Sequence, residues 1–142
     1  MRSQTDVLRT QHEELRTAIE RIGQHAVAAD VGALAQALRA LKVALLAHLE
    51  LEDSHLYPEL ALAAAQAESA VPVGVADTYQ HNMKGVSTSL KAFLDQYDAS
   101  FRMDDFQRDW PLVARMLCHR MESEEATLYP LYDAWCSRQR LP

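Results

Sequence analysis

Apolar side chains recur at helical spacing along almost all of this 142-residue chain, and this periodicity restricts the fold more than any other feature. One stretch, from about residue 5 to residue 23, places them at steps of three and four residues, as an amphipathic helix does. A second begins after Asp30, a candidate N-cap, and reaches about residue 62. The chain is predicted to form four helices, whose stripes are Leu8, Leu15, Ile19 and Ile22; Leu34, Leu38, Leu41 and Leu45; Met83, Val86, Leu90, Phe93 and Tyr97; and Leu112, Val113, Met116, Leu117, Met121, Leu128 and Trp135.

Prolines lie near the predicted starts of the third and fourth helices. Pro72 interrupts the pattern within residues 69–74, before the third helix. Proline is tolerated in the first turn of a helix but kinks its interior, so Pro111 leaves two starts open for the fourth helix. That helix begins near Asp109, or near Asp104 with a kink at the proline.

Composition supports an all-α fold. Only 4 Gly and 5 Pro accompany 49% hydrophobic residues, a balance that suits helices and opposes disorder or a turn-rich β fold. Four amphipathic helices of similar length with short connections pack most simply as an antiparallel, up-down-up-down four-helix bundle. The expected organisation is a single domain over residues 1–142.

Charge and composition exclude several partners. A net charge of -6 gives no electrostatic attraction for nucleic acid. The chain has no uncharged apolar window of 18 residues, so no membrane span is expected. The first residues do not resemble a signal peptide, and the spacing of Cys118 and Cys136 suits neither zinc nor a disulfide framework. A cytoplasmic location is expected.

One heptapeptide occurs twice. Residues 52–58 read EDSHLYP and residues 124–130 read EEATLYP, in helices that should run in the same direction. Pro58 and Pro130 each remove an amide just past the acidic pair, and should bend or end their helices. Tyr57 and Tyr129 are expected to close the core, with hydrogen bonds to groups around the functional site as the less favoured alternative.

Histidines and acids share the inward face of the first two helices. His12 falls within about 60° of the apolar stripe of its helix at 100° per residue. His48, Glu52 and His55 stand at i, i+4 and i+7, again within about 60° of one face. A buried carboxylate without a partner is costly, and no Lys or Arg shares this stripe. A bound cation explains the cluster better than a salt bridge.

The fourth helix carries a similar but irregular set. The repeat aligns Glu124 with Glu52, but His119 precedes Glu124 by five residues, which separates them by about 140° on a regular α-helix. A π-turn between His119 and Glu124 would bring both onto one face, and one is predicted there. With unbroken α-helical bonding, Glu122 would be the inward acid instead.

His81 on the third helix has the weakest pattern. It lies roughly 140° from the apolar stripe and becomes a surface residue unless an irregularity near Gly85 rotates it inward. At a rise of about 1.5 Å per residue, His12, Glu52, His81 and Glu124 nevertheless fall near one level of an antiparallel bundle.

These residues make the chain resemble the hemerythrin-like (HHE cation-binding) family, four-helix bundles that hold a non-haem di-iron centre. The matching pieces are QHEEL, HLELEDSHLYP, QHNMKG and HRMESEEATLYP. The resemblance implies that Glu52 and Glu124 bridge two iron ions, with His12 and His48 on one iron and His81 and His119 on the other. Oxygen-carrying members have two histidines four apart on the third helix, whereas this chain has Asp77 and Gly85 four residues on either side of His81. His55, Asp77 or solvent would complete the site.

The expected function follows from that resemblance. It is a binding protein with two iron ions, or manganese or zinc, that takes up O2 or a related diatomic such as nitric oxide as a carrier, store or sensor. A di-metal oxidase or peroxidase, or a protein that repairs nitric-oxide-damaged iron centres, is the enzymatic alternative, because the missing histidine leaves an open position. A metal-free structural bundle is the third possibility.

Overall fold

The structure, a computed structural model, describes residues 3–68, 71–99 and 101–140. Within these residues the chain is helical and contains no strand. In order, the elements are α1 (Gln4–Val27), α2 (Val31–Leu51), η1 (Glu52–Leu56), α3 (Tyr57–Gln66), α4 (Val71–Ala99), α5 (Met103–Ser123), η2 (Glu124–Leu128) and α6 (Tyr129–Arg140), where η marks a π-helical turn. α2, η1 and α3 follow one another without a break and make one rod, as do α5, η2 and α6.

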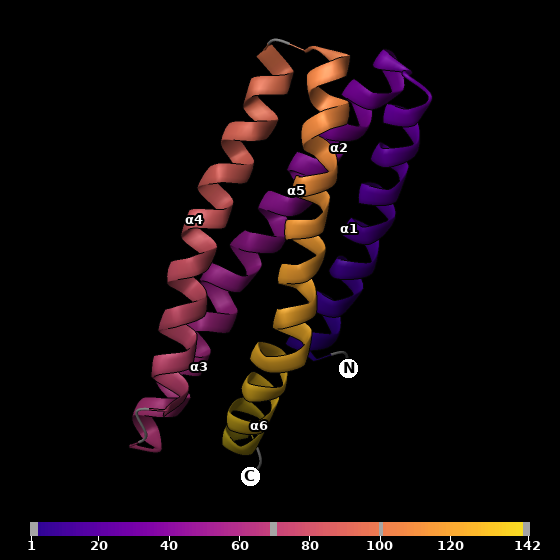
Figure 1. The fold of residues 1–142 in the computed structure, drawn as a ribbon. Helices are drawn as coiled ribbons and strands as arrows, with labels where there is room; N and C mark the ends of the chain where they lie inside the picture. Colours follow the sequence, from indigo (N-terminus) through magenta and orange to yellow (C-terminus); the bar gives the residue numbers. More distant parts are fainter. Residues whose placement is uncertain (1–2, 69–70, 100, 141–142) are drawn as a thin grey trace.

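The four rods form a bundle in which successive rods run in opposite directions (Figure 1). α1 packs against α2 and α5, whereas α3 packs against α4 and α6. The all-α, four-helix prediction is therefore confirmed.

Polar side chains cap the first two helices. Ser3 and Asp6 form a capping box, in which the Ser3 hydroxyl accepts from the Asp6 amide at 3.1 Å and Asp6 accepts from the Ser3 amide at 3.3 Å. The predicted N-cap of the second helix is confirmed, because Asp30 accepts from the Ala33 amide at 3.1 Å.

The later boundaries settle the open alternatives. α4 begins at Val71, inside the predicted break at 69–74, of which residues 69 and 70 lie outside the described chain. α5 begins at Met103 and continues through Pro111, so the start near Asp104 is correct and the start near Asp109 is wrong. Asp104 and Asp105 lie in the first turn of α5, where a negative charge interacts favourably with the helix dipole. Phe106 is fully buried and packs that turn against the core.

The core has two apolar parts with a polar layer between them. One cluster lies toward the α1–α2 connection and includes Leu15, Leu45 and Leu117; the other includes Leu8, Leu56 and Leu128. On α1, α2–η1 and α5–η2 the buried residues between these leucines are charged or polar, apart from Met121 on α5. The charged or polar ones are His12, His48, Glu52 and Glu124.

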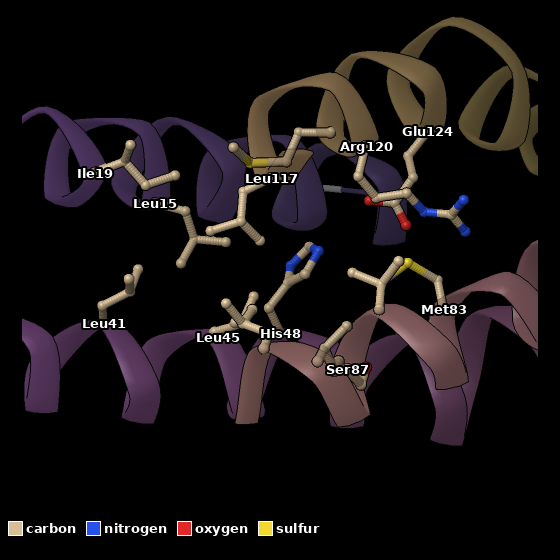
Figure 2. Close-up of a pocket in the computed structure, with 14 residues that line it drawn as sticks. Leu15, Ile19, Leu41, Leu45, His48, Met83, Ser87, Leu117, Arg120 and Glu124 are labelled. Atoms are coloured by element: carbon tan, nitrogen blue, oxygen red, sulfur yellow. The ribbon is translucent and has the colours of Figure 1, made fainter. Parts of the chain in front are cut away.

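A small cavity of about 20 Å³ adjoins this polar layer. Leucines, methionines and other apolar residues from all four rods form most of its wall, and His48, Arg120 and Glu124 lie at one end (Figure 2). A space of this size holds about one water-sized molecule.

The rod of residues Val31–Gln66 is apolar as well as long. An 18-residue window in it reaches a mean hydropathy of 1.3, enough by length and composition to cross a membrane, although only 28% of that window is buried inside the bundle. Core helices of water-soluble proteins meet the same criterion, and this rod carries the buried His48 and Glu52. The finding is therefore weak evidence for a membrane span.

Two leucines of α3 test the packing of the apolar cluster that contains Leu8, Leu56 and Leu128. Leu60 is 0% exposed and Leu62 is 60% exposed, so Leu60→Ala should lower the free energy of unfolding by about 2–5 kcal/mol and Leu62→Ala by no more than about 0.5 kcal/mol. Urea unfolding followed by circular dichroism measures both values. Equal losses in the two variants would contradict the packing described.

Candidate metal centre

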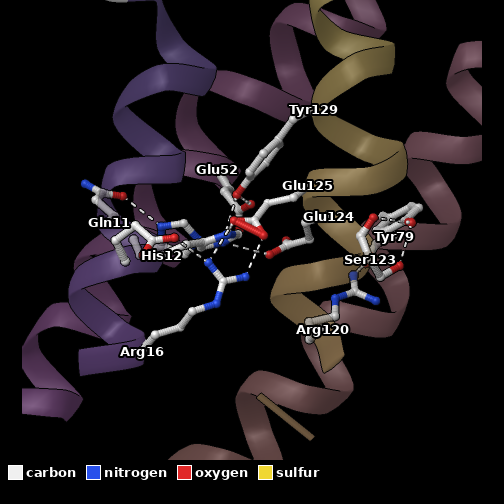
Figure 3. A network of polar contacts seen from close by, with 12 residues as sticks. Gln11, His12, Arg16, Glu52, Tyr79, Arg120, Ser123, Glu124, Glu125 and Tyr129 are labelled. Carbon is white, nitrogen blue, oxygen red and sulfur yellow. Dashed lines mark hydrogen bonds and ion pairs between the residues drawn. The ribbon is translucent and has the colours of Figure 1, made fainter. Parts of the chain in front are cut away.

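Four ionisable side chains meet in the polar layer. His12 on α1 is 0% exposed, His48 on α2 is 2% exposed, and Glu52 and Glu124, at the starts of the two π-turns, are each 1% exposed. The inward orientation predicted for these four residues is confirmed. Three separate rods thus contribute to one buried group (Figure 3).

The spacing of their nitrogen and oxygen atoms suits one metal ion. The Nε2 atom of His12 lies 3.1 Å from Nε2 of His48 and 3.2 Å from Oε1 of Glu124. Nε2 of His48 lies 3.5 Å from Oε1 of Glu52. Ligands at about 2.0–2.2 Å from a tetrahedral ion stand roughly 3.4 Å apart, close to these separations. Of the four residues, His12, His48 and Glu124 form a group whose ligand atoms all lie within 4.8 Å of one another; Glu52 is outside that group and adjoins it at His48.

Several atoms of this group have no hydrogen-bond partner in the described chain. They include Oε1 of Glu52 and Oε2 of Glu124, both buried. Tyr129 satisfies the other Glu52 oxygen, because its hydroxyl donates to Oε2 at 3.0 Å. Unpartnered buried carboxylate oxygens are costly, so a cation that binds them would remove a large penalty.

Neighbouring side chains orient the two imidazoles. Nδ1 of His48 lies 2.7 Å from Oε1 of Gln11; an amide oxygen only accepts, so the proton sits on Nδ1 and the Nε2 lone pair faces the group. Nδ1 of His12 lies 3.3 Å from Oε1 of Glu125. Arg16 holds Glu125 in place with two hydrogen bonds, of 3.0 and 2.5 Å.

Burial shifts the pKa of all four central groups toward their neutral forms. Desolvation lowers the pKa of His12, and desolvation together with the nearby His12 lowers that of His48 to about 3. Desolvation raises the pKa of Glu124 to about 7, and desolvation and the adjacent Glu124 raise that of Glu52 well above its ordinary value. Neutral imidazoles are ready to ligate, and a bound cation would favour the ionised form of both carboxyls.

The two π-turns place the acids. The amide of Tyr57 bonds to the Glu52 carbonyl, and the amide of Tyr129 bonds to the Glu124 carbonyl, each five residues back. The prediction of a π-turn between His119 and Glu124 is therefore wrong in position, because α5 is regular to Ser123 and the π-turn begins at Glu124. Glu124 is nevertheless the buried acid, and Glu122 is exposed.

Three histidines proposed as ligands do not join the group. His119 is exposed because regular helix separates it from Glu124 by about 140°. His81 is exposed because α4 passes Gly85 without an irregularity. His55 is exposed because the extra residue in η1 turns it away from the face of His48 and Glu52. Asp77, the possible substitute, is also exposed.

Sequence reasoning missed the residues that surround the ligands. Gln11 and Glu125 each stand next to a ligand in the chain, and the doubled acid of the repeat was the signal for Glu125. Arg120 precedes Glu124 by four residues, as His48 precedes Glu52. Tyr129 was assigned to packing, but it contacts Glu52 and His12.

Comparison with known proteins agrees with this geometry. A family profile described as "Hemerythrin HHE cation binding domain" matches residues 3–132, which is most of the chain. Searches of curated proteins and of solved structures found no significant match.

Variants of Gln11 test whether the hydrogen bond between Gln11 and His48 contributes to cation affinity. Gln11→Ala should weaken cation binding about 10–100-fold, because the His48 ring loses the acceptor that fixes it. Gln11→Glu keeps an acceptor and should retain most of the affinity, and Gln24→Ala, at an exposed site on α1, should bind normally. Competition between the protein and a chromophoric chelator for Co²⁺ measures the affinities. Unchanged affinity in Gln11→Ala would remove this role.

Glu124 should make the metal-free protein less stable at high pH. In the folded chain its pKa is about 7, against an ordinary value of 4.5, so between these values the folded state binds more protons and the free energy of unfolding falls as pH rises. The side chain in Glu124→Gln cannot ionise, so at pH 8 the free energy of unfolding of this variant should be higher than that of the wild type by on the order of 2–3 kcal/mol. Below about pH 4.5 the two values should not differ.

Urea unfolding in the presence of a chelator, at several pH values, measures this difference. Glu122→Gln, at an exposed position, is the matched control and should follow the wild type. Parallel pH profiles for the Glu124 variant and the wild type would show that burial of this carboxyl is not a source of instability.

Proposed function

Because the chain belongs to the hemerythrin HHE cation-binding family, we propose that it binds iron in the polar layer and takes up a small diatomic molecule, O2 or nitric oxide, beside it. His12, His48, Glu52 and Glu124 would hold the metal. Imidazole and carboxylate together suit iron, manganese or zinc. Bound iron would supply the affinity for a diatomic ligand, and the protein supplies the shape and polarity of the space around it.

The cavity beside His48 and Glu124 carries this proposal. It accommodates about one water-sized molecule, and its wall is mainly leucine and methionine, with Leu15, Leu45 and Met83 among the lining residues (Figure 2). A small apolar space with imidazole and carboxylate at one end suits a diatomic molecule held next to a metal.

The same wall favours binding over turnover. Peroxide forms hydrogen bonds through both of its oxygens, whereas most residues around the cavity offer only hydrocarbon or thioether surface. O2 and nitric oxide form weak hydrogen bonds and lose little on entering such a space. A carrier, store or sensor is therefore preferred to a peroxidase.

A second iron has less support. The family resemblance assigns it to His81 and His119, and both are exposed. The candidate ligands that the described chain brings together would serve one ion.

Iron loading and nitric oxide binding test the proposed function. Protein loaded with Fe²⁺ under anaerobic conditions should retain iron after desalting, and should develop a saturable absorption change when nitric oxide is added. His48→Ala should lose most of its iron, while His25→Ala, outside the group, should keep it. A protein that retains no metal above the level of a chelated control would contradict the proposal.

A cavity variant separates diatomic binding from iron binding. Val86 lines the cavity, so Val86→Leu should reduce nitric oxide affinity while iron content stays unchanged. Val27→Leu makes the same replacement at a side chain that is 87% exposed and should leave both properties intact. Equal nitric oxide affinity in the Val86 variant and the wild type would place the diatomic elsewhere.

A further inference from the structure

The two halves of the repeat have the same helical register but differ at one position. The amide of Glu52 bonds back to the carbonyl of His48, and the amide of Glu124 bonds back to the carbonyl of Arg120. A π-turn follows each acid. Arg120 therefore occupies, on α5, the position that His48 occupies on α2. At four residues from Glu124 it is only about 40° from the acid around the helix, whereas His119 is about 140° away.

Contacts with α4 hold Arg120 in this position. Its guanidinium lies 4.7 Å from the centre of the Tyr79 ring and donates to the Tyr79 carbonyl at 2.9 Å. The Tyr79 hydroxyl in turn lies 2.8 Å from the Ser123 hydroxyl, next to Glu124. Figure 3 shows Arg120 beside Tyr79 and Ser123, on the side of Glu124 away from His12. Arg120 also lines the cavity and lies near enough to Glu124 to favour its ionised form.

The α4 side of the centre also lacks an imidazole among its described residues. Met83 and Leu90 are the buried residues of α4 that line the cavity, and His81, two positions before Met83, is exposed. The thioether of Met83 is a soft, weak ligand that does not replace an imidazole for iron. The α4–α5 side thus presents a thioether and a guanidinium, which cannot be deprotonated in a protein and offers no lone pair to a metal.

Charge balance agrees with this arrangement. One divalent cation neutralises Glu52 and Glu124, because both imidazoles bind as neutral ligands. Glu125 is already paired with Arg16 at 2.5 Å and is not needed for that balance. With the charge of the half-buried Arg120 counted, one divalent cation leaves a net charge of +1, whereas two would leave +3, and buried unbalanced charge is strongly unfavourable.

We propose that this centre is mononuclear: one metal ion binds to His12, His48, Glu52 and Glu124, and Arg120 takes the place that the ligands of a second ion would need. This inference rests on the proposed metal-binding function and departs from the two-iron expectation. Arg120 contributes a permanent positive charge on the side of Glu124 where the second ion would lie.

Metal stoichiometry tests the inference separately from the function. Wild-type protein titrated anaerobically with Fe²⁺, then desalted and analysed for iron and protein, should contain about one ion per chain. After oxidation, an isolated ferric ion should give a high-spin paramagnetic resonance signal, which a strongly coupled pair would not. Two ions per chain would overturn the mononuclear assignment, whereas a chain that retains no iron would overturn the proposed function itself.

Single variants identify the ligands. His81→Ala and His119→Ala change exposed residues and should leave iron content and affinity unchanged, whereas His48→Ala should lower the affinity at least tenfold. A tenfold loss of affinity or a fall in iron content in either exposed variant would overturn the inference. These two variants alter the surface only, so their folding does not limit the test.

A gain of the second ion tests the role of Arg120. The double variant Arg120→His with Met83→His removes the guanidinium and supplies two imidazoles on the α4–α5 side. Its iron content should rise toward two ions per chain, with circular dichroism confirming that the bundle is intact. A folded double variant that still binds one ion would show that Arg120 does not exclude the second, and would overturn that part of the inference.

Discussion

The burial of two carboxyls and two imidazoles inside an apolar bundle is the constraint on which the rest of this structure depends. The solvent is almost fully excluded from His12, His48, Glu52 and Glu124. They lie between the apolar cluster that includes Leu15 and the cluster that includes Leu8. Without a cation, burial raises the pKa of both carboxyls, and one oxygen of each lacks a hydrogen-bond partner in the described chain. The family to which the chain belongs binds cations, and a cation resolves both penalties at once.

Local backbone irregularity turns a repeated sequence into two inward-facing acids. Pro58 and Pro130 have no amide to bond to the residue four positions earlier, so helical hydrogen bonding changes register just before them. The π-turns that result begin at Glu52 and Glu124. They keep the acids in line with the regular helix on their N-terminal side and rotate the residues that follow.

The bundle is less symmetric than its repeat. On one side, two imidazoles with firm supporting contacts face the acids; on the other, Arg120 bonds across to α4 through Tyr79. The apolar cavity opens between these sides, next to His48. In the proposed mononuclear centre, this asymmetry would limit the number of ions and leave room for a small ligand on the cavity side.

The sequence alone determined the helical class, the apolar stripes and the inward direction of His12, His48 and Glu52, because these depend only on spacing along regular helices. It left Glu124 and Glu122 open as the acid of the second repeat, and the structure decided for Glu124. The exposure of His55 and His119 and the supporting contacts of Gln11, Arg16 and Arg120 required the tertiary structure. Where a π-turn begins depends on hydrogen bonding summed over a whole rod, and which side chain crosses to a neighbouring helix depends on how the rods pack. Neither the start of a π-turn nor a contact between rods can be read from the periodicity of a single segment.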